Sequence, residues 1–175
     1  MGMVERLGGG TSGVTRKTSF PPVVDTSTRV LILGSLPGDA SLAAGRYYAH
    51  PQNQFWRLLS PVVGVDLPTL DYSTRLEALQ AAGIGLWDVV ASATRPGSSD
   101  AAIRDATAND VATLIASLPV LRVVAFNGGT AWKAGRGLVR GVEMLALPSS
   151  SPLHTVGVAA KQPAWDAIGS YLRHS

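Results

Sequence analysis

Four short segments of small and polar residues carry most of the chemistry that this sequence could perform. They are Gly34–Gly38 (GSLPG), Asp88 with the loop after it, Phe126–Gly129 (FNGG) and Leu147–Pro152 (LPSSSP). Glycines let a backbone approach a ligand closely, and the free amides of such a turn can bind an anion. GSLPG matches neither the dinucleotide fingerprint nor the P-loop, so a purely structural turn explains it equally well.

Three consecutive serines, Ser149, Ser150 and Ser151, lie between two prolines and close to His154. A serine nucleophile with His154 as its base is one interpretation, but the sequence has no GxSxG turn of the kind that many serine hydrolases use. A rigid polar loop is another interpretation. If the loop binds a ligand, its amides and hydroxyls suit a phosphate better than they suit hydrolysis.

Four side chains are candidates for direct contact with a ligand. Asn53 lies where a helix begins, so it is either a helix cap or a functional amide. Tyr48 is either a packed aromatic residue or a platform for a planar base. Asp88 interrupts an apolar strand, so it must pair with a cation such as Arg95 or accept a hydrogen bond from a ligand. Asn127 precedes two glycines, where it is suited to supporting a left-handed turn.

Short apolar runs alternate with amphipathic segments along the chain, which is the pattern of a parallel sheet covered by helices. Strands are predicted at 29–33, 84–90, 121–126 and 142–147. Helices are predicted at about 55–62, 74–83 and 111–118, in a short segment after 129, and from about 163 to 172. We therefore expect an α/β fold, namely a three-layer α/β/α domain with a central four-stranded parallel sheet. The four polar segments follow its strands, where such sheets bind their ligands.

Composition excludes several classes of protein. Hydrophobic residues make up 46% of the 175 residues, which is too many for a disordered chain, and no apolar run reaches the ~18 residues of a membrane span. The lack of cysteine excludes disulfides, thiol nucleophiles and cysteine-based metal sites, and three histidines do not favour a metal site either. A net charge of +3 is compatible with a polyanionic partner.

The length fits a single domain. Residues 1–19 are expected to form a flexible N-terminal tail, because Gly8–Gly10 and the neighbouring Ser and Thr residues can bury little surface. Residues 20–175 are then the single folded domain. The N-terminal segment lacks the apolar stretch of a signal peptide, so we expect a cytoplasmic protein.

Taken together, the motifs resemble the uracil-DNA glycosylase superfamily, and most closely its hypoxanthine-DNA glycosylase (deoxyinosine glycosylase) family. That family shows a GS-hydrophobic-PG motif, YYAHPxNxFW, an LWD strand followed by GS and D, an FNGG element and LPSxSP. The matching segments here are Gly34–Gly38, Tyr47–Trp56, Leu86–Asp88 with Gly97–Asp100, Phe126–Gly129 and Leu147–Pro152. The likeness extends in order from about residue 20 to the end of the chain.

The resemblance implies a monofunctional DNA glycosylase of base excision repair, which acts on DNA containing deaminated bases. Most of the superfamily has a water-activating Asp or Asn at the third position of the first motif, where this chain has Leu36. The histidine that opens the second motif in the classical uracil enzymes is replaced by Leu147. Both departures disfavour uracil and leave hypoxanthine as the expected base. In the hypoxanthine branch the Asn of HPxNxFW is catalytic, and that residue is Asn53 here.

The resemblance also assigns roles to the other candidate residues. Asn53 would position the attacking water, Tyr48 would stack on the base, and Asp88 would accept a hydrogen bond from hypoxanthine N1–H. The base-binding set is Gly34, Ser35, Leu36, Gly38, Tyr48, Asp88 and Asn127. The DNA-binding set is Ser149, Ser150, Ser151, Leu153 and His154, of which the last two are candidates for a wedge that fills the gap left by the flipped base.

The resemblance implies no cofactor, no metal and no membrane, and we expect a monomer that is associated with the nucleoid if the source is bacterial. The motifs contain no lysine, so a Schiff-base lyase step is not expected. Three alternatives stay open. They are a uracil or mismatch-type glycosylase, a catalytically weak DNA-binding homologue, and a small-molecule hydrolase that uses Ser149–Ser151.

Overall fold

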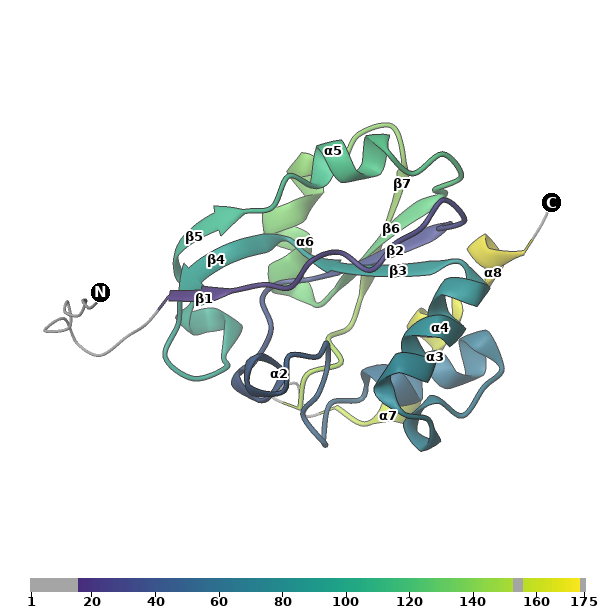
Figure 1. The fold of residues 1–175 in the computed structure, drawn as a ribbon, viewed down its shortest axis with the longest axis horizontal. Coiled ribbons are helices and arrows are strands. Elements are labelled where there is room, and N and C mark those ends of the chain that lie inside the picture. Colours follow the sequence, from purple (N-terminus) through teal and green to yellow (C-terminus); the bar gives the residue numbers. More distant parts are fainter. Residues whose placement is uncertain (1–15, 153–155, 174–175) are drawn as a thin grey trace, which may run out of the picture.

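A four-stranded parallel sheet forms the centre of the protein in a computed structural model that describes residues 16–152 and 156–173 (Figure 1). Its strands are β2 (Val30–Gly34), β3 (Ile84–Asp88), β6 (Val123–Asn127) and β7 (Glu143–Leu147), in the spatial order β3-β2-β6-β7. All three pairings are parallel. The prediction of a central four-stranded parallel sheet is therefore confirmed.

Helices cover both faces of this sheet (Figure 1). One face carries α5 (Val111–Ala116) and α6 (Gly129–Gly135), and the other carries α3 (Phe55–Val63), α4 (Tyr72–Ala82), α7 (Val158–Asp166) and α8 (Gly169–Leu172). Successive strand residues alternate between the two cores, so that Leu31 and Leu33 face the first set of helices while Val30 and Ile32 face the second. The predicted three layers are thus confirmed.

Short elements connect these layers. They are α2 (Asp39–Ala44) and the 3-10 helices η2 (Leu67–Thr69), η3 (Asp100–Ala102) and η4 (Arg136–Leu138). Helix α7 begins at Val158, earlier than the predicted start near residue 163, and it contains Pro163. Burial of Trp165 explains why the helix survives an internal proline, because its packing outweighs the lost backbone hydrogen bond.

A second sheet, which the sequence pattern did not predict, is antiparallel in the order β1-β4-β5. Its strands are β1 (Arg16–Thr18), β4 (Val90–Thr94) and β5 (Arg104–Ala108). The predicted strand 84–90 is therefore two strands that meet at Val89 and belong to different sheets. The Val89 and Val90 amides donate to the carbonyls of Gly34 and Ser35, so the chain follows the loop after β2 before it leaves the parallel sheet.

Residues 16–18 belong to the predicted flexible tail, but they form the strand β1, so the folded domain includes residues on the N-terminal side of residue 20. Lys17 holds this strand in place, because its ammonium group donates to Asp39 and to the Gly97 carbonyl, both at 2.6 Å. A polar strand of three residues shows no useful hydrophobic periodicity, which explains why the pattern did not reveal it. Residues 1–15 lie outside the described part of the chain.

The register of the parallel sheet brings the predicted site segments together. Gly34 lies opposite Asp88, and Asn127 lies opposite Leu147, in neighbouring strand pairs. The carboxyl ends of all four strands therefore meet at one edge. This is the convergence that the order of the motifs predicts, although the segments are far apart in sequence.

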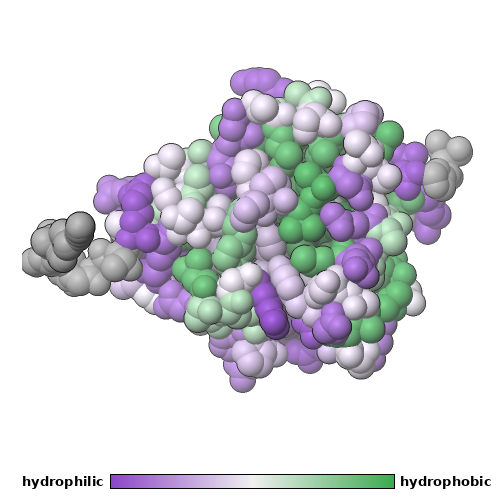
Figure 2. Space-filling view, in the orientation of Figure 1, coloured by the Kyte–Doolittle hydropathy of each residue, from purple (hydrophilic) through white to green (hydrophobic). Residues whose placement is uncertain are grey.

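Most large apolar side chains are buried in the two cores, and those exposed among the described residues are scattered: Val65, Val120, Met144 and Val156. Figure 2 shows apolar residues in a band across the middle of one face, with polar residues toward both ends. Within the described ranges, no helix has the length and apolar character needed to cross a bilayer.

Packing of α6 on the sheet predicts that Gly135→Ala destabilises the protein. A Cβ atom there would lie 2.5 Å from the Phe126 ring and 2.8 Å from Val89, although the φ of −104° is open to any residue. We expect the free energy of unfolding in urea to fall by about 1–3 kcal/mol, as for other overpacked cores. Gly137→Ala is the control, because a Cβ there meets nothing within 4 Å. Equal stability of the two variants would contradict this account of the α6 contact.

Candidate active site

The loops at the carboxyl edge of the sheet enclose a cavity of about 400 Å³, a size typical of sites for small molecules. Every predicted site residue that the structure describes lines it: Gly34, Ser35, Leu36, Gly38, Tyr48, Asn53, Asp88, Asn127, Ser149, Ser150 and Ser151. Leu153 and His154, the predicted wedge residues, lie outside the described residues. The structure thus brings the described residues of the predicted base-binding and DNA-binding sets into one cavity.

Gly34 is a glycine because two polar side chains occupy the space beside it. A Cβ atom at this position would lie 2.7 Å from Asp88 Oδ1 and 3.1 Å from the Tyr48 hydroxyl. The Tyr48 hydroxyl and Asp88 Oδ2 are both buried, and neither has a hydrogen-bond partner among the described residues. Buried polar atoms without partners are costly, so this pair is a candidate for contact with a ligand.

The Asp88 side chain is almost fully buried, with 3% of its surface exposed. Burial raises the pKa of Asp88 to about 7; the nearby Asp100 carboxylate raises it further, and the Arg95 guanidinium acts in the opposite direction. Arg95 forms its ion pair with Asp100, at 3.9 Å, and no cation in the described ranges lies within ion-pair distance of Asp88. The alternative that Asp88 is neutralised by Arg95 is therefore not observed.

Tyr48 is held in an unusual backbone conformation. Its φ is +53°, in the left-handed region that a bulky residue rarely adopts, and the Trp56 indole N–H donates to its carbonyl at 3.1 Å. The Tyr48 ring stacks on Phe55, with ring centres 3.8 Å apart and planes inclined by 10°. A planar ligand can therefore stack only on the opposite face of the Tyr48 ring. Burial, with a smaller contribution from Asp88, raises the pKa of Tyr48, so its hydroxyl stays protonated.

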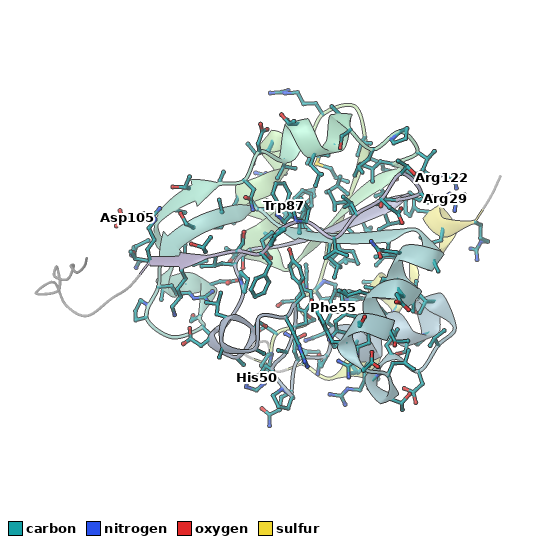
Figure 3. All side chains as sticks on the ribbon, viewed as in Figure 1. Arg29, His50, Phe55, Trp87, Asp105 and Arg122 are labelled. Atoms are coloured by element: carbon teal, nitrogen blue, oxygen red, sulfur yellow. The ribbon has the colours of Figure 1, made fainter. Side chains whose placement is uncertain are left out.

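Asn53 combines a structural contact with a place in the cavity wall. Its Oδ1 accepts a hydrogen bond at 2.9 Å from the amide of Phe55, the first residue of α3, although the N-cap position itself is occupied by Gln54. Its side-chain NH2 group donates to no described residue. Figure 3 shows Phe55 in the interior of the molecule, whereas His50 projects from its edge. Both the capping and the functional interpretation of Asn53 are thus compatible with its position.

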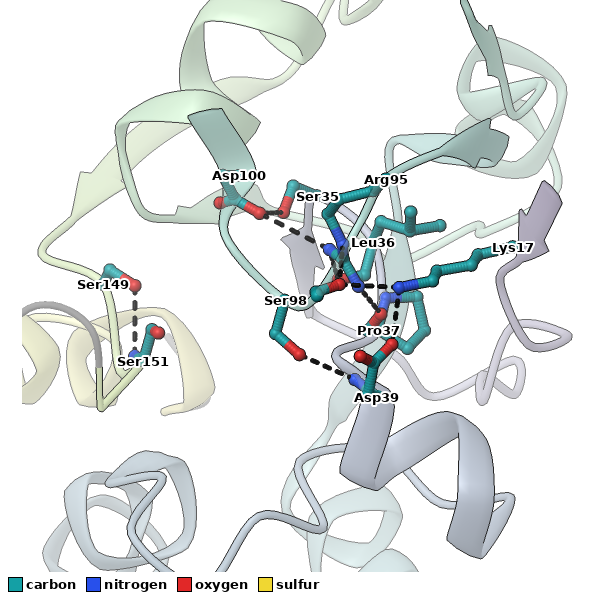
Figure 4. Close-up of polar contacts among 11 residues, drawn as sticks. Lys17, Ser35, Leu36, Pro37, Asp39, Arg95, Ser98, Asp100, Ser149 and Ser151 are labelled. Atoms are coloured by element: carbon teal, nitrogen blue, oxygen red, sulfur yellow. Dashed lines mark hydrogen bonds and ion pairs between the residues drawn. The ribbon is translucent and has the colours of Figure 1, made fainter. Parts of the chain in front are cut away.

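The GSLPG loop is fixed from one side by the buried guanidinium of Arg95 (Figure 4). Arg95 donates to the carbonyls of Leu36 and Pro37, and its Nε donates to the Gly97 carbonyl at 3.0 Å. The amides of Ser35 and Leu36 donate to no described residue. They are therefore available as donors to an anionic ligand.

Asp100 is a part of the site to which sequence reasoning gave no role. The Ser35 hydroxyl donates to its Oδ1 at 2.7 Å, and the residue lines the cavity (Figure 4). Burial raises the pKa of Asp100, while the Ser35 hydrogen bond and Arg95 lower it. An arginine buried behind a Gly/Pro loop needs a counter-charge, and that requirement was the signal that could have revealed Asp100.

Asn127 and Ser150 bind each other rather than the solvent. Asn127 Nδ2 donates to the Ser150 hydroxyl and the Ser150 amide donates to Asn127 Oδ1, both at 2.9 Å. Ser150 is 1% exposed, so its side chain holds the loop after β7 against β6. The prediction that Asn127 supports the left-handed turn after it is therefore wrong, because its side chain binds Ser150 instead. The backbone turn is made at Gly128, which has a φ of +99° and leaves only 3.0 Å between its Cβ position and Ser149 Cβ.

The Asn53 segment is tied to the serine loop by Gln54. The Gln54 amide donates to the Ser150 carbonyl at 3.0 Å, and the buried Lys161 donates to Gln54 Oε1 at 2.7 Å. Ser149 and Ser151 lie beside this junction, and the Ser149 hydroxyl accepts from the Ser151 amide (Figure 4). Within the described part of the chain, no cluster of His, Asp and Glu could hold a metal ion.

Burial of Asp88 predicts a pH-dependent stability. Because the pKa of Asp88 is raised from 3.8 to about 7 on folding, the folded protein binds a proton that the unfolded chain lacks between these values. This contribution is complete below about pH 4 and is lost as the pH rises through about 7. Asp88→Asn lacks it. The Tm difference, variant minus wild type, should therefore be larger at about pH 8 than at about pH 5. A difference that is constant with pH would show that Asp88 does not titrate in this way.

A family model described as the uracil DNA glycosylase superfamily matches residues 21–169 of the chain. A protein from Methanosarcina barkeri named hypoxanthine DNA glycosylase is 42% identical over 151 residues, which cover 86% of this chain and 96% of the relative. A Methanosarcina acetivorans protein of the same name is 40% identical over 156 residues, which cover 87% of this chain and 97% of the relative.

A solved structure has a similar fold. The solution NMR structure of a Methanosarcina acetivorans protein named after uracil DNA glycosylase superimposes with a TM-score of 0.81 and 39% sequence identity. The likeness covers 91% of this chain and 100% of that one. The three-layer fold, the site at the carboxyl edge of its parallel sheet and these similarities lead to one conclusion: the chain belongs to the uracil DNA glycosylase superfamily.

Proposed function

We propose that this protein is a monofunctional DNA glycosylase that removes deaminated bases, above all hypoxanthine, by hydrolysis of the N-glycosidic bond in base excision repair. The observation that carries the proposal is the single cavity on which Asn53, Tyr48 and Asp88 converge beside the free amides of the GSLPG loop. Two relatives at 42% and 40% identity bear the name hypoxanthine DNA glycosylase, which supports this choice of base.

The target nucleotide must leave the base stack before its glycosidic bond can be reached. In the cavity, the base would stack on the face of Tyr48 that Phe55 leaves open. Cleavage of the bond places negative charge on the base, and the amides of Ser35 and Leu36 are suited to stabilise it. The donors are already fixed by the contacts of Arg95 with the loop carbonyls, so little reorganisation is needed at the moment of reaction.

Asn53 is the residue that we assign to water activation. Leu36 takes the place of the usual Asp or Asn, and its apolar side chain, 6% exposed, cannot orient a water molecule. Leu147, which replaces the histidine of the second motif, is 4% exposed. Asn53 is polar, lines the cavity and has an NH2 group that binds no described residue. It can hold a water molecule near the sugar without acting as a strong base.

Contacts to the DNA backbone are assigned to Ser149 and Ser151, since the Ser150 side chain is buried against Asn127. A second cavity of about 280 Å³ adjoins the first and shares Tyr48, His50 and Asn53 with it. Arg57 and Arg75 border this second cavity. The Arg75 guanidinium already donates to the carbonyls of Leu67, Pro68 and Leu70, whereas Arg57 is exposed. A guanidinium group binds phosphate well, so we assign the neighbouring backbone of the lesion strand to the surface around Arg57.

We propose that the enzyme acts as a monomer in the cytoplasm, on the nucleoid if its source is bacterial, and that it needs no cofactor. Neutral hydrogen-bond donors and a positioned water suffice for a reaction in which the base departs early. DNA is its partner as the substrate.

A substrate panel tests the proposed activity. Duplexes that carry one hypoxanthine, uracil, xanthine or mismatched thymine are incubated with the protein, and abasic sites are then cleaved with alkali. We expect the fastest release from the hypoxanthine duplex, because the side chains at positions 36 and 147 lack the groups used for uracil. Faster release of uracil would favour the uracil or mismatch alternative. Binding of the hypoxanthine duplex without any release would favour the catalytically weak homologue.

Asn53→Ala should slow the single-turnover release of hypoxanthine by ~10²-fold or more, the scale of a lost positioning group. Affinity for lesion DNA should stay within a few-fold, since Asn53 is not assigned to binding. Asn53→Asp should retain more activity than Asn53→Ala, because a carboxylate also orients water. Gln52→Ala, at the exposed neighbouring residue, is the matched control and should keep the wild-type rate.

Measurement of Tm on the same samples separates catalysis from capping. Loss of the contact between Asn53 Oδ1 and the Phe55 amide should cost roughly 1 kcal/mol of stability, whatever the role in catalysis. A lowered Tm together with a normal rate in the folded fraction would make Asn53 a helix cap only. A slow rate in a protein that is folded at the assay temperature supports the catalytic assignment.

A further inference from the structure

Asp88 is the one buried carboxyl group of the cavity lining for which the described residues provide no hydrogen-bond donor and no paired cation. Its Oδ2 is buried, and its Oδ1 lies 2.7 Å from the position that a Cβ of Gly34 would take. The absence of a side chain at Gly34 thus keeps room for this carboxyl group at the end of β2. The inference below rests on the proposed function, because it concerns how the same cavity treats the departing base.

None of the described side chains around Asp88 fully stabilises a negative charge on its carboxyl group. The loop before α3 contributes the hydroxyls of Tyr47 and Tyr48, of which the Tyr47 hydroxyl donates to the Pro21 carbonyl. The segment that begins η3 contributes the like charge of Asp100. The end of β4 leads to Arg95, whose guanidinium is engaged by three carbonyls and by Asp100.

An ionised carboxylate in such a place would have one oxygen buried from water and no hydrogen bond or ion pair with a described residue, which disfavours the charged form. The neutral form loses much less on burial, because it carries no net charge. The pKa of Asp88 is raised to about 7, mainly by burial, which also favours the neutral form. Other enzymes keep a carboxylic acid neutral in an apolar site so that it can donate a hydrogen bond.

We propose that Asp88 acts as a neutral carboxylic acid, whose O–H donates a hydrogen bond to the base carbonyl while its C=O accepts from the adjacent N–H. Hypoxanthine presents these two groups side by side, as O6 and N1–H. A carboxylic acid matches both of them at once, in a planar pair of hydrogen bonds. An ionised Asp88 could accept from N1–H, but it would repel O6.

The donor becomes more important as the bond breaks. The C1′–N9 bond breaks, its electron pair stays on the base, and part of the resulting charge is carried by O6. The Asp88 proton stays on Asp88 and stabilises that charge through the hydrogen bond. The water oxygen bonds to C1′ and releases its proton to solvent, and the free base takes a proton from solvent afterwards. Donors aimed at developing charge act mainly on the rate of the step rather than on substrate affinity.

The test compares the pH dependence of single-turnover hypoxanthine release by the wild type, Asp88→Asn and Asp88→Ala between about pH 5.5 and about pH 8. The wild-type rate should fall by about tenfold from pH 6 to pH 8, as Asp88 ionises near pH 7. Asp88→Asn always offers one N–H donor and one C=O acceptor, so its rate should change by less than about threefold. Asp88→Ala should be slower by ~10²-fold throughout, the typical cost of a lost donor of this kind.

Two results would overturn the inference. A wild-type rate that rises with pH would mean that the carboxylate form is the active one. An unchanged pH profile in Asp88→Asn would assign the titration to another group. The Tm of Asp88→Asn across the same pH range checks that this variant folds like the wild type. Absence of hypoxanthine release by the wild type at every pH would refute the proposed function instead, so the two failures are distinguishable.

Discussion

The buried guanidinium of Arg95 is the interaction on which the cavity depends. Burial of an arginine is costly unless its hydrogen bonds are nearly all made, and here the partners are loop carbonyls and one carboxylate. These contacts join the GSLPG loop after β2 to the loop that follows β4. As a result, the carbonyls of Leu36 and Pro37 are occupied, whereas the amides of Ser35 and Leu36 are left for a ligand. A loop of glycine and proline thereby becomes a rigid set of donors.

The site contains features that lower the stability of a folded protein. The Tyr48 hydroxyl and Asp88 Oδ2 are buried without partners in the described structure, and Tyr48 has a positive φ. Such features are expected where a protein binds a ligand, because the ligand supplies what the fold lacks. The surrounding contacts absorb the cost. Phe55 stacks on Tyr48, Trp56 binds its carbonyl, and the reciprocal pair of Asn127 and Ser150 holds the opposite wall.

Sequence reasoning succeeded where the signal was local and periodic, and it failed where a partner came from a distant segment. The strands 30–34 and 123–127 are short apolar runs, so the parallel sheet could be predicted. The split near Val89 could not, because Val89 and Val90 continue the apolar pattern after Asp88 and the change of sheet is decided by contacts with Gly34 and Ser35. Sequence reasoning included Asp100 in a motif but gave it no role for a similar reason, since its partners Ser35 and Arg95 lie in other loops.

By itself, the sequence determined the fold class, the order of the motifs and the edge of the sheet at which they meet, because hydrophobic periodicity and turn residues are properties of neighbouring positions. Only the tertiary structure decided what each polar side chain does. It set Asn127 and Ser150 to bind each other, directed Arg95 to carbonyls and Asp100 rather than to Asp88, and left Asp88 without a counter-ion. The physical reason is that the energy of a buried polar group depends on the donors, charges and water around it, and these are brought together only when the chain folds.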